Sequence, residues 1–201
     1  MDAAARAGWA PRDLLRAYLD GGATFIQIRA KHLESGPFLA LCDDAVRLAQ
    51  PYGGHIVVND RIDVARMAGA AGVHVGQDDL PPRQARQMLG ADAVVGYSTH
   101  SIEQADAALA EPVSYIAVGP IFGTRTKDTG YDAVGLDLVR AVVSRAGAVP
   151  VVAIGGITQD TVASVLDAGA RSVAVIGDLL AGGDPAARVA AYLQVLARYR
   201  V

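Results

Sequence analysis

The chain of 201 residues has a formal net charge of −3; 52% of its residues are hydrophobic and only 5% are aromatic. This length suits a single domain with a sizeable buried core. The charge gives no electrostatic reason to expect nucleic acid or an anionic membrane as a partner, so any anion site must be a local cluster. A single cysteine, Cys42, excludes an internal disulfide and fits a reducing, cytoplasmic compartment. No apolar run reaches the roughly 18 residues of a membrane span, and the N-terminus has no signal-peptide core.

Hydrophobic patterning predicts helices that alternate with short strands along the whole chain. The strands are β-branched and apolar throughout, which is typical of parallel strands buried on both faces. The predicted strands are 25–29, 56–58, 73–75, 93–96, 115–118, 151–154 and 172–176. The predicted helices are 11–21, 38–49, 62–70, 82–89, 102–109, 136–143, 158–168 and 185–199.

Two parallel architectures compete for this pattern, a closed barrel and an open doubly wound sheet. No strand is followed by a G-x-G-x-x-G fingerprint and an acidic residue, which disfavours the open sheet. Gly155-Gly156 and Gly177 follow the last two strands, where barrels commonly bind phosphate. We therefore expect one α/β domain over residues 1–201, a (β/α)₈ TIM barrel. Only seven strands can be placed, so we expect the barrel to lack its first strand and the chain to begin at an internal methionine.

Polar residues and glycines follow every predicted strand. In a barrel these strand ends meet on one face, where active sites lie. This convergence of polar residues predicts an active site on that face, and the prediction does not depend on any single residue. The residues are Gln27, Arg29, Lys31, Asn59, Asp60, Gln77, Asp78, Asp79, Ser98, His100, Thr124, Thr126, Lys127, Gly155, Gly156 and Gly177.

The longest of these segments is the loop 119–132, Gly-Pro-Ile-Phe-Gly-Thr-Arg-Thr-Lys-Asp-Thr-Gly-Tyr-Asp. A long polar loop directly after a buried strand commonly carries function. Thr124, Thr126 and Lys127 offer hydrogen bonds and a positive charge that suit a phosphorylated ligand. A solvated surface loop is the alternative. With cations and carboxylates converging from neighbouring strands, we expect the loop to lie between two substrates as a lid.

Two aspartates are the candidate metal ligands. Asp60 and Asp79 end adjacent strands, and Mg²⁺ is held by one or two carboxylates together with substrate phosphates. Asp60 could instead cap the next helix, and Asp79 could form a turn. A zinc site is not expected, because no Cys/His cluster has ligand spacing.

The cationic side chains and the glycines are candidate anion-binding groups. Each of them also has a purely structural interpretation. Arg29 and Lys31 point to one side of their strand end and could bind diphosphate or simply be solvated. Gly155-Gly156 and Gly177 could present backbone N–H groups to phosphate or form tight turns.

Of the four histidines, His74 suits a satisfied core position, and His32 and His55 suit the surface. His100 either caps the next helix or touches the site. Cys42 suits the core rather than a nucleophile. The residues as a whole indicate two anion sites and one metal, which fits a transfer between two phosphorylated molecules with diphosphate leaving.

Five segments in register make the chain resemble the thiamine phosphate synthase family. They are Gln27-Ile-Arg-Ala-Lys31, Asn59-Asp60, Gly72-Val-His-Val-Gly-Gln-Asp-Asp79, Gly119-Pro-Ile-Phe-Gly-Thr-Arg-Thr-Lys127 and Val152-Ala-Ile-Gly-Gly-Ile157. The resemblance runs from about residue 12 to the end. It implies a Mg²⁺-dependent transferase of thiamine biosynthesis that joins 4-amino-2-methyl-5-(diphosphooxymethyl)pyrimidine to a thiazole phosphate, giving thiamine phosphate and diphosphate.

The resemblance also implies residue roles. Asp60 and Asp79 would hold Mg²⁺, while Arg29, Lys31, Ser98 and Lys127 would be the catalytic groups. The pyrimidine diphosphate would be held by Gln27, Arg29, Lys31, Asn59, Ser98 and Lys127. The thiazole phosphate would be held by Thr124, Thr126, Gly156, Ile176 and Gly177.

Two departures from the family pattern accompany the resemblance. Family members usually carry Ser where this chain has Gly177, so a weaker thiazole phosphate site is expected; a hydrogen bond to a charged group is worth about 1.5–3 kcal/mol. The family's first strand tends to end in a pattern like Ile-Thr-Asp, and only Met1-Asp2 stands at that place.

Two other functions stay open. Thiazole tautomerases share the fold but tend to lose the two aspartates and to carry His where this chain has Pro120. A non-catalytic ligand-binding or regulatory barrel is the other alternative. Neither nucleic acid nor a membrane is expected as a partner, and a homo-oligomer is compatible with the sequence.

Overall fold

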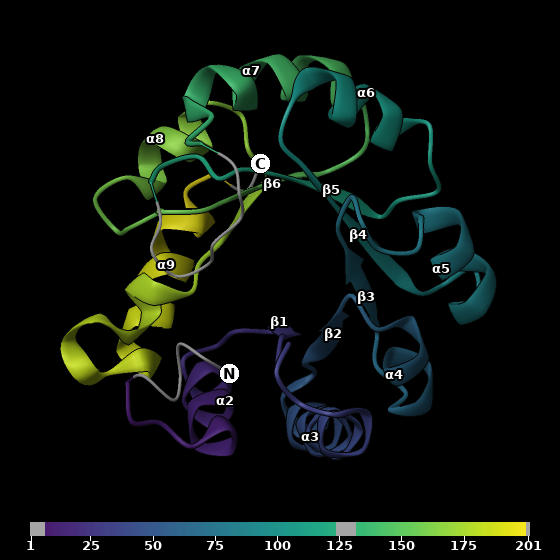
Figure 1. The fold of residues 1–201 in the computed structure, drawn as a ribbon. Helices are drawn as coiled ribbons and strands as arrows, with labels where there is room; N and C mark the ends of the chain where they lie inside the picture. Colours follow the sequence, from purple (N-terminus) through teal and green to yellow (C-terminus); the bar gives the residue numbers. More distant parts are fainter. Residues whose placement is uncertain (1–6, 124–131, 200–201) are drawn as a thin grey trace.

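Seven parallel strands form one curved sheet with helices on its outer side (Figure 1). The structure, a computed structural model, describes residues 7–123 and 132–199. Strand order in space follows chain order. The strands are β1 (Phe25–Ile28), β2 (His55–Asn59), β3 (Gly72–Val75), β4 (Val94–Thr99), β5 (Tyr115–Val118), β6 (Val151–Ile154) and β7 (Ser172–Ala174).

The helices alternate with the strands and cover the convex face of the sheet, as Figure 1 shows. They are α2 (Pro11–Asp20), α3 (Ser35–Ala49), α4 (Ile62–Met67), α5 (Pro82–Leu89), α6 (Ile102–Leu109), α7 (Gly135–Ala146), α8 (Val162–Asp167) and α9 (Pro185–Ala197), with short 3₁₀ turns η1 (Gln50–Tyr52) and η2 (Gly177–Gly183). The predicted TIM-barrel class with seven placeable strands is confirmed.

The hydrophobic core lies between the sheet and its helices. Val58, Val73 and Val95 of neighbouring strands are completely buried against α3 and α4. A second cluster joins β5 and β6 to α7 and α8. Cys42 of α3 is fully buried in this layer, and burial together with Asp43 raises the pKa of its thiol to about 12, so the predicted core role is confirmed.

The concave face carries a row of polar residues. The register pairs Asn59 with His74, His74 with Gly96, and Gly96 with Tyr115. Side chains paired in this way point to the same face of the sheet. The inside of the curved sheet is therefore lined by functional groups as well as by apolar residues.

The layer of helices continues between β1 and β7, the two edge strands of the described sheet. Among the described residues, no ladder joins β1 to β7, but α2 packs against α9. A Cβ on Gly21 would lie 2.5 Å from the carbonyl oxygen of Ala186, so the absence of a side chain there permits this close approach.

Several element boundaries were predicted wrongly. They include the start of α3 at Ser35 and the ends of α4 at Met67, of β4 at Thr99 and of α7 at Ala146. Helix 158–168 begins only at Val162, because the Thr161 hydroxyl accepts the Thr158 N–H at 2.9 Å and forms a turn over residues 158–161. The predicted strand 172–176 ends at Ala174. In the described parts of the chain, no helix combines the length and apolarity that crossing a bilayer requires.

Candidate active site

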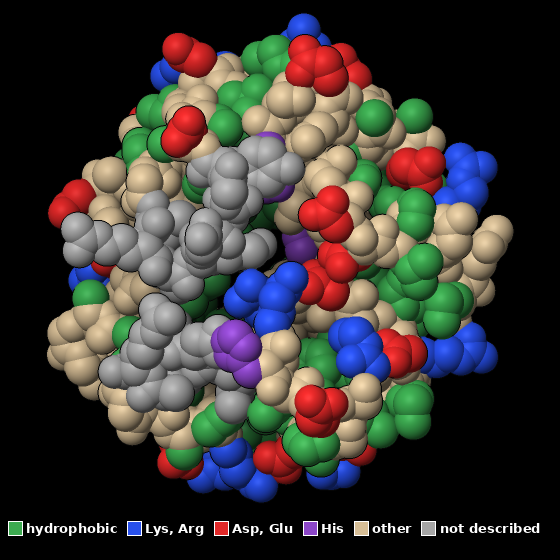
Figure 2. All heavy atoms as spheres, viewed as in Figure 1, with side chains coloured by type: hydrophobic (Ala, Val, Ile, Leu, Met, Phe, Trp, Pro, Cys, Tyr) green, Lys and Arg blue, Asp and Glu red, His purple; other side chains and the backbone are tan. Residues whose placement is uncertain are grey.

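Charged side chains gather at the centre of the face to which the loops after the strands belong. Figure 2 shows basic and acidic groups side by side around a central hollow. The Lys31 Nζ lies 3.0 Å from an Asp60 carboxylate oxygen, which joins the loop after β1 to the end of β2. The two strand ends therefore converge in the structure, as predicted.

Asp60 adopts an unusual backbone conformation. Its φ is +64°, the left-handed region, which is uncommon for a residue other than glycine. The Asp60 N–H donates to the carbonyl of His74 at 2.8 Å. The N-cap position of α4 is Arg61, so the alternative in which Asp60 caps this helix is wrong. Backbone strain of this kind clusters at functional sites.

Asp79 faces the same cluster from the loop after β3. Its Oδ2 accepts the Gly76 N–H at 2.7 Å, so it does form the turn that was weighed as an alternative. Its pKa is raised, first by burial and then by the nearby Asp60 carboxylate, against the lowering effects of the Gly76 N–H and Lys31. A carboxylate whose ionisation is disfavoured by burial and by a second carboxylate nearby marks a place where a cation would be stabilising.

The other diphosphate candidates lie around this cluster. Asn59 is buried at the end of β2, and Arg29 is half-buried after β1. Gln27 points to the concave face, because its neighbours Ile26 and Ile28 pack into the core on the helix side.

Ser98 is part of a chain of hydrogen bonds inside the curved sheet. Its hydroxyl lies 2.8 Å from Nε2 of His74, and Nδ1 of His74 lies 2.8 Å from the hydroxyl of Tyr115. Burial raises the pKa of Tyr115, so its hydroxyl stays protonated. If that hydroxyl donates to Nδ1, then Nε2–H donates to Ser98, and the Ser98 proton is left to point at a bound anion.

His74 and Tyr115 were not predicted as site residues. The prediction that His74 is a satisfied core residue is confirmed, but its partner Ser98 makes it relevant to the site. Gly96 separates the two in the register, and a Cβ there would lie 2.5 Å from Nδ1 of His74 and 2.4 Å from the hydroxyl of Tyr115. A glycine inside a strand was the sequence signal of this close contact.

The second glycine-rich region joins the ends of β5 and β6. Gly155 and Gly156 have φ of +99° and +66°. A Cβ on Gly156 would lie 2.7 Å from both the carbonyl oxygen of Gly123 and the Cβ of Phe122. Phe122 N–H donates to Gly155 at 3.0 Å. The glycines thus permit close packing as well as turns.

The chain matches known proteins over most of its length. Residues 6–179 match the family profile described as thiamine monophosphate synthase. A thiamine-phosphate synthase of Koribacter versatilis is 47% identical over 176 residues, which are 88% of this chain and 82% of the relative. One from Thermus thermophilus is 44% identical over 183 residues, 90% of this chain and 87% of the relative. The chain belongs to the thiamine-phosphate synthase family.

A solved structure agrees with this membership. The thiamine phosphate pyrophosphorylase of Pyrococcus furiosus superposes with a TM-score of 0.87 at 29% identity, covering 94% of this chain and 91% of that one. The resemblance inferred from the five segments is confirmed, and the family is one of transferases in thiamine biosynthesis.

Other predicted site residues belong to the loop after β5 and to the start of η2. Thr124, Thr126 and Lys127 lie outside the described residues. Ile176 and Gly177 are exposed at the start of η2, beyond β7. His100 contacts the carbonyl of Gly119, and Ser101 is the N-cap of α6, so the helix-cap alternative for the His100 side chain is wrong. His32 and His55 are exposed, as predicted.

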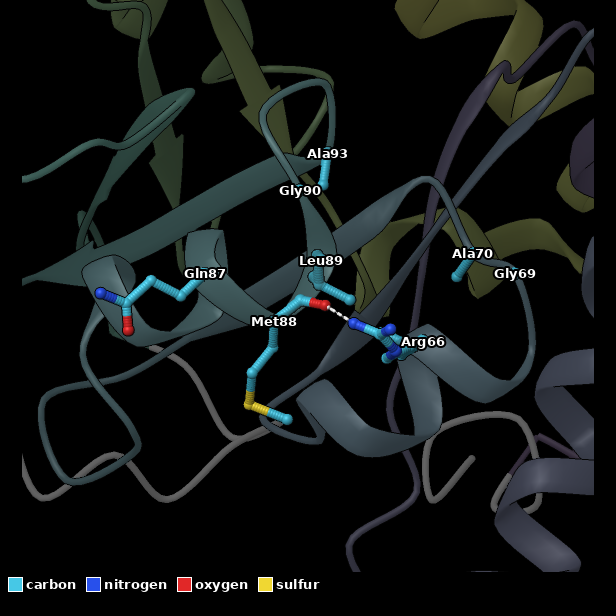
Figure 3. A pocket seen from close by; sticks show the side chains of 9 residues that line it. Arg66, Gly69, Ala70, Gln87, Met88, Leu89, Gly90 and Ala93 are labelled. Atoms are coloured by element: carbon cyan, nitrogen blue, oxygen red, sulfur yellow. Dashed lines mark hydrogen bonds between the residues drawn. The ribbon is translucent and has the colours of Figure 1, made fainter.

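A separate open cavity of about 460 Å³ lies at the other end of the strands (Figure 3). It is lined by residues that precede β3 and β4, including Gly69 and Gly90, and Arg66 on its wall donates to the carbonyl of Met88. In synthase-family barrels, as in other barrels, chemistry is expected at the carboxyl ends of strands, so this cavity is not the candidate site.

Proposed function

We propose that this protein is a thiamine phosphate synthase that condenses 4-amino-2-methyl-5-(diphosphooxymethyl)pyrimidine with a thiazole ethyl phosphate, or its carboxylated form, and releases diphosphate. The contact of Lys31 with Asp60, beside Asp79, carries the proposal. A cation and two carboxylates at adjoining strand ends suit a diphosphate with its divalent metal.

Mg²⁺ is the proposed cofactor, with Asp60 and Asp79 as its protein ligands. Among the described residues, no group of three or more His, Cys, Asp or Glu could hold a metal. Two carboxylates nevertheless fit Mg²⁺, which commonly takes its other ligands from water and substrate phosphates. When bound, it would neutralise the charge that develops on departing diphosphate.

The protein's own side chains would contribute the remaining catalysis by positioning the substrates and by stabilising the charge on the diphosphate. Arg29 and Lys31 would bind the diphosphate, and Ser98 would donate a hydrogen bond to it through the proton that His74 leaves available. Gln27 and Asn59 would hold the pyrimidine part. As the C–O bond to diphosphate breaks, the pyrimidine methylene carbon becomes cationic and the thiazole nitrogen attacks it. No protein nucleophile is required.

The thiazole phosphate would lie on the β6 and β7 side. Gly156, Ile176 and Gly177 would offer backbone N–H groups, with Thr124 and Thr126 contributing from the loop after β5, while Lys127 of the same loop would bind the diphosphate. We propose that a single domain contains both sites. We also propose that the protein acts in the cytoplasm.

The test is the rate of diphosphate release with both substrates, with each omitted in turn, and with Mg²⁺ chelated. The proposal expects release only when both substrates and Mg²⁺ are present. Aromatisation of the thiazole carboxylate without diphosphate release would instead support the tautomerase alternative. Binding of the thiazole phosphate with neither reaction would support a ligand-binding barrel.

A further inference from the structure

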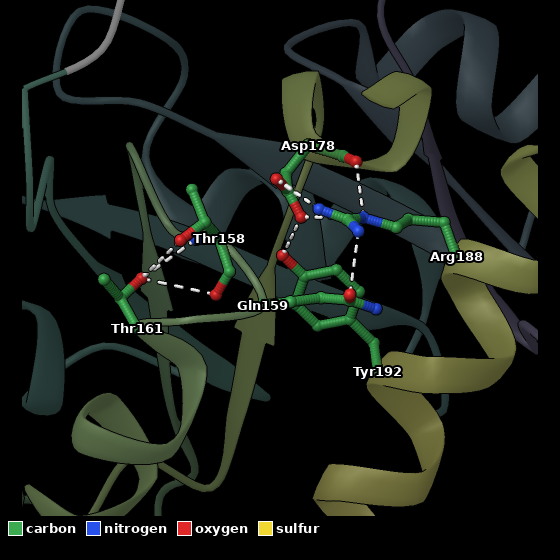
Figure 4. A network of polar contacts seen from close by, with 6 residues as sticks. All are labelled: Thr158, Gln159, Thr161, Asp178, Arg188 and Tyr192. Carbon is green, nitrogen blue, oxygen red and sulfur yellow. Dashed lines mark hydrogen bonds and ion pairs between the residues drawn. The ribbon is translucent and has the colours of Figure 1, made fainter. Parts of the chain in front are cut away.

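A partly buried ion pair lies directly beside the proposed thiazole phosphate site. Asp178 follows Gly177 in η2, and its carboxylate oxygens lie 2.9 Å from Nη2 and 3.1 Å from Nε of Arg188 on α9 (Figure 4). The hydroxyl of Tyr192 donates to the same carboxylate at 2.5 Å. Arg188 Nη1 also donates to the side-chain oxygen of Gln159 at 2.7 Å.

The network joins the two backbone segments proposed to hold the phosphate. Arg188 Nε also donates to the backbone carbonyl of Asp178 at 3.1 Å, so it fixes the η2 backbone as well as the carboxylate. Gln159 lies in the turn that follows Gly155-Gly156, and Thr158 and Thr161 close that turn. One guanidinium therefore bridges the turn after β6 and the turn after β7.

The charge of Asp178 is compensated almost entirely by this network. Its side chain is only 11% exposed, and that of Arg188 is 27% exposed. Burial acts to raise the pKa of Asp178, but the hydrogen bonds from Arg188 and Tyr192 outweigh it and the pKa is lowered. The group is a carboxylate at neutral pH.

A carboxylate at this position would oppose the binding of phosphate. Consecutive Cα atoms are about 3.8 Å apart, so Asp178 adjoins the Gly177 N–H that is proposed to face the phosphate. A carboxylate and an anion bound at the preceding residue repel each other, and the repulsion grows where water is excluded. Pairing of Asp178 with Arg188 therefore favours an anion site at Gly177.

We propose that Arg188 is a positioning residue for the thiazole phosphate, which it serves by cancelling the charge of Asp178 and by joining the turns of Gly177 and Gln159. It does not contact the substrate in this role. The inference rests on the proposed function, since it presumes that the phosphate of the thiazole lies at Gly177. No motif in the sequence indicated it.

The test compares two variants that break the same ion pair with opposite changes in charge. Arg188→Gln leaves Asp178 uncompensated, and we expect the Kd of thiazole ethyl phosphate, measured by calorimetry, to weaken about tenfold or more. Asp178→Asn removes the anion, and we expect that Kd to stay unchanged or to tighten. Both variants should leave the Kd of the pyrimidine diphosphate with Mg²⁺ within about twofold, because its site is formed by other strands.

Matched variants separate this role from a purely structural one. Arg188→Lys keeps the charge but loses the bidentate geometry, so we expect its Kd for thiazole ethyl phosphate to lie between those of the unaltered protein and Arg188→Gln. Arg140→Gln removes an exposed cation that pairs with Asp137 on α7 and should change neither Kd. Thermal unfolding confirms that each variant is folded at the assay temperature.

The inference is overturned if Arg188→Gln and Asp178→Asn weaken thiazole phosphate binding alike, or if Arg188→Gln weakens both ligands equally. Failure of the proposed function would be seen differently, as absence of diphosphate release by the unaltered protein with both substrates and Mg²⁺.

Discussion

In the two halves of the candidate site, the surroundings shift the pKa of an aspartate in opposite directions. On the β1–β3 side, burial and the nearby Asp60 carboxylate raise the pKa of Asp79, and Asp60 has a φ of +64°. On the β6–β7 side, Asp178 is compensated by Arg188 and Tyr192, and its pKa is lowered. In the first half, a bound cation would stabilise the two carboxylates. In the second half, Arg188 and Tyr192 already stabilise the carboxylate before any ligand binds. Binding of two different anions, one with the proposed Mg²⁺ and one without, would account for the difference.

The largest expected effect is on the metal side. Asp60→Ala should lower Mg²⁺-dependent diphosphate release at least about 100-fold, since metal coordination contributes several kcal/mol to such transition states. The control is Asp63→Ala, which removes a nearby carboxylate that pairs with Arg61. Turnover of Asp60→Ala close to that of the control would contradict the metal assignment.

Gly156→Ala tests whether the β6 side depends on close backbone packing. The added Cβ would meet Gly123 and Phe122 at 2.7 Å, and φ is +66°. We expect a loss of about 2–3 kcal/mol in the free energy of unfolding by urea. Gly53→Ala is the matched control, because Gly53 has φ of +63° with no atom within 4 Å of the added Cβ. Equal losses in both variants would show that backbone strain alone matters.

The pH dependence of stability should differ in sign between the two halves. Ionisation of Asp79 opposes folding, because its folded pKa is raised; stability therefore falls as pH rises from the unfolded value of about 4 through the folded pKa. Asp178 has a lowered folded pKa, so its contribution is present above about pH 4 and is lost as pH falls through the folded value.

At pH 7 without Mg²⁺, Asp79→Asn should therefore raise the free energy of unfolding. Asp178→Asn should lower it, by about 1–3 kcal/mol through the loss of its charged hydrogen bonds. Urea denaturation of both variants measures the two changes, and changes of the same sign would refute the comparison.

The smallest expected effect concerns the hydrogen-bond chain behind Ser98. Tyr115→Phe removes the hydroxyl that is hydrogen-bonded to Nδ1 of His74, and we expect kcat to fall about three- to tenfold with an unchanged KM for the thiazole phosphate. Ser98→Ala should lower kcat at least as much. A Tyr115→Phe variant with full kcat would show that the hydrogen-bond chain behind Ser98 has a packing role and no part in catalysis.

The sequence predicted the repeating architecture because periodicity and strand composition are local properties. It also predicted that Lys31, Asp60 and Asp79 meet, since parallel strands bring successive ends to one face. It did not predict the φ of Asp60, the link from His74 to Tyr115, or the pairing of Asp178 with Arg188. These depend on the register across strands and on how α9 packs, which no short segment encodes.

The measurement that tests the contrast between the two halves most directly is calorimetric titration of each substrate with and without Mg²⁺. The account predicts that Mg²⁺ tightens binding of the pyrimidine diphosphate at least about tenfold, because the cation relieves Asp60 and Asp79. It also predicts that the Kd of thiazole ethyl phosphate does not change. Equal dependence of both substrates on Mg²⁺, or of neither, would contradict it.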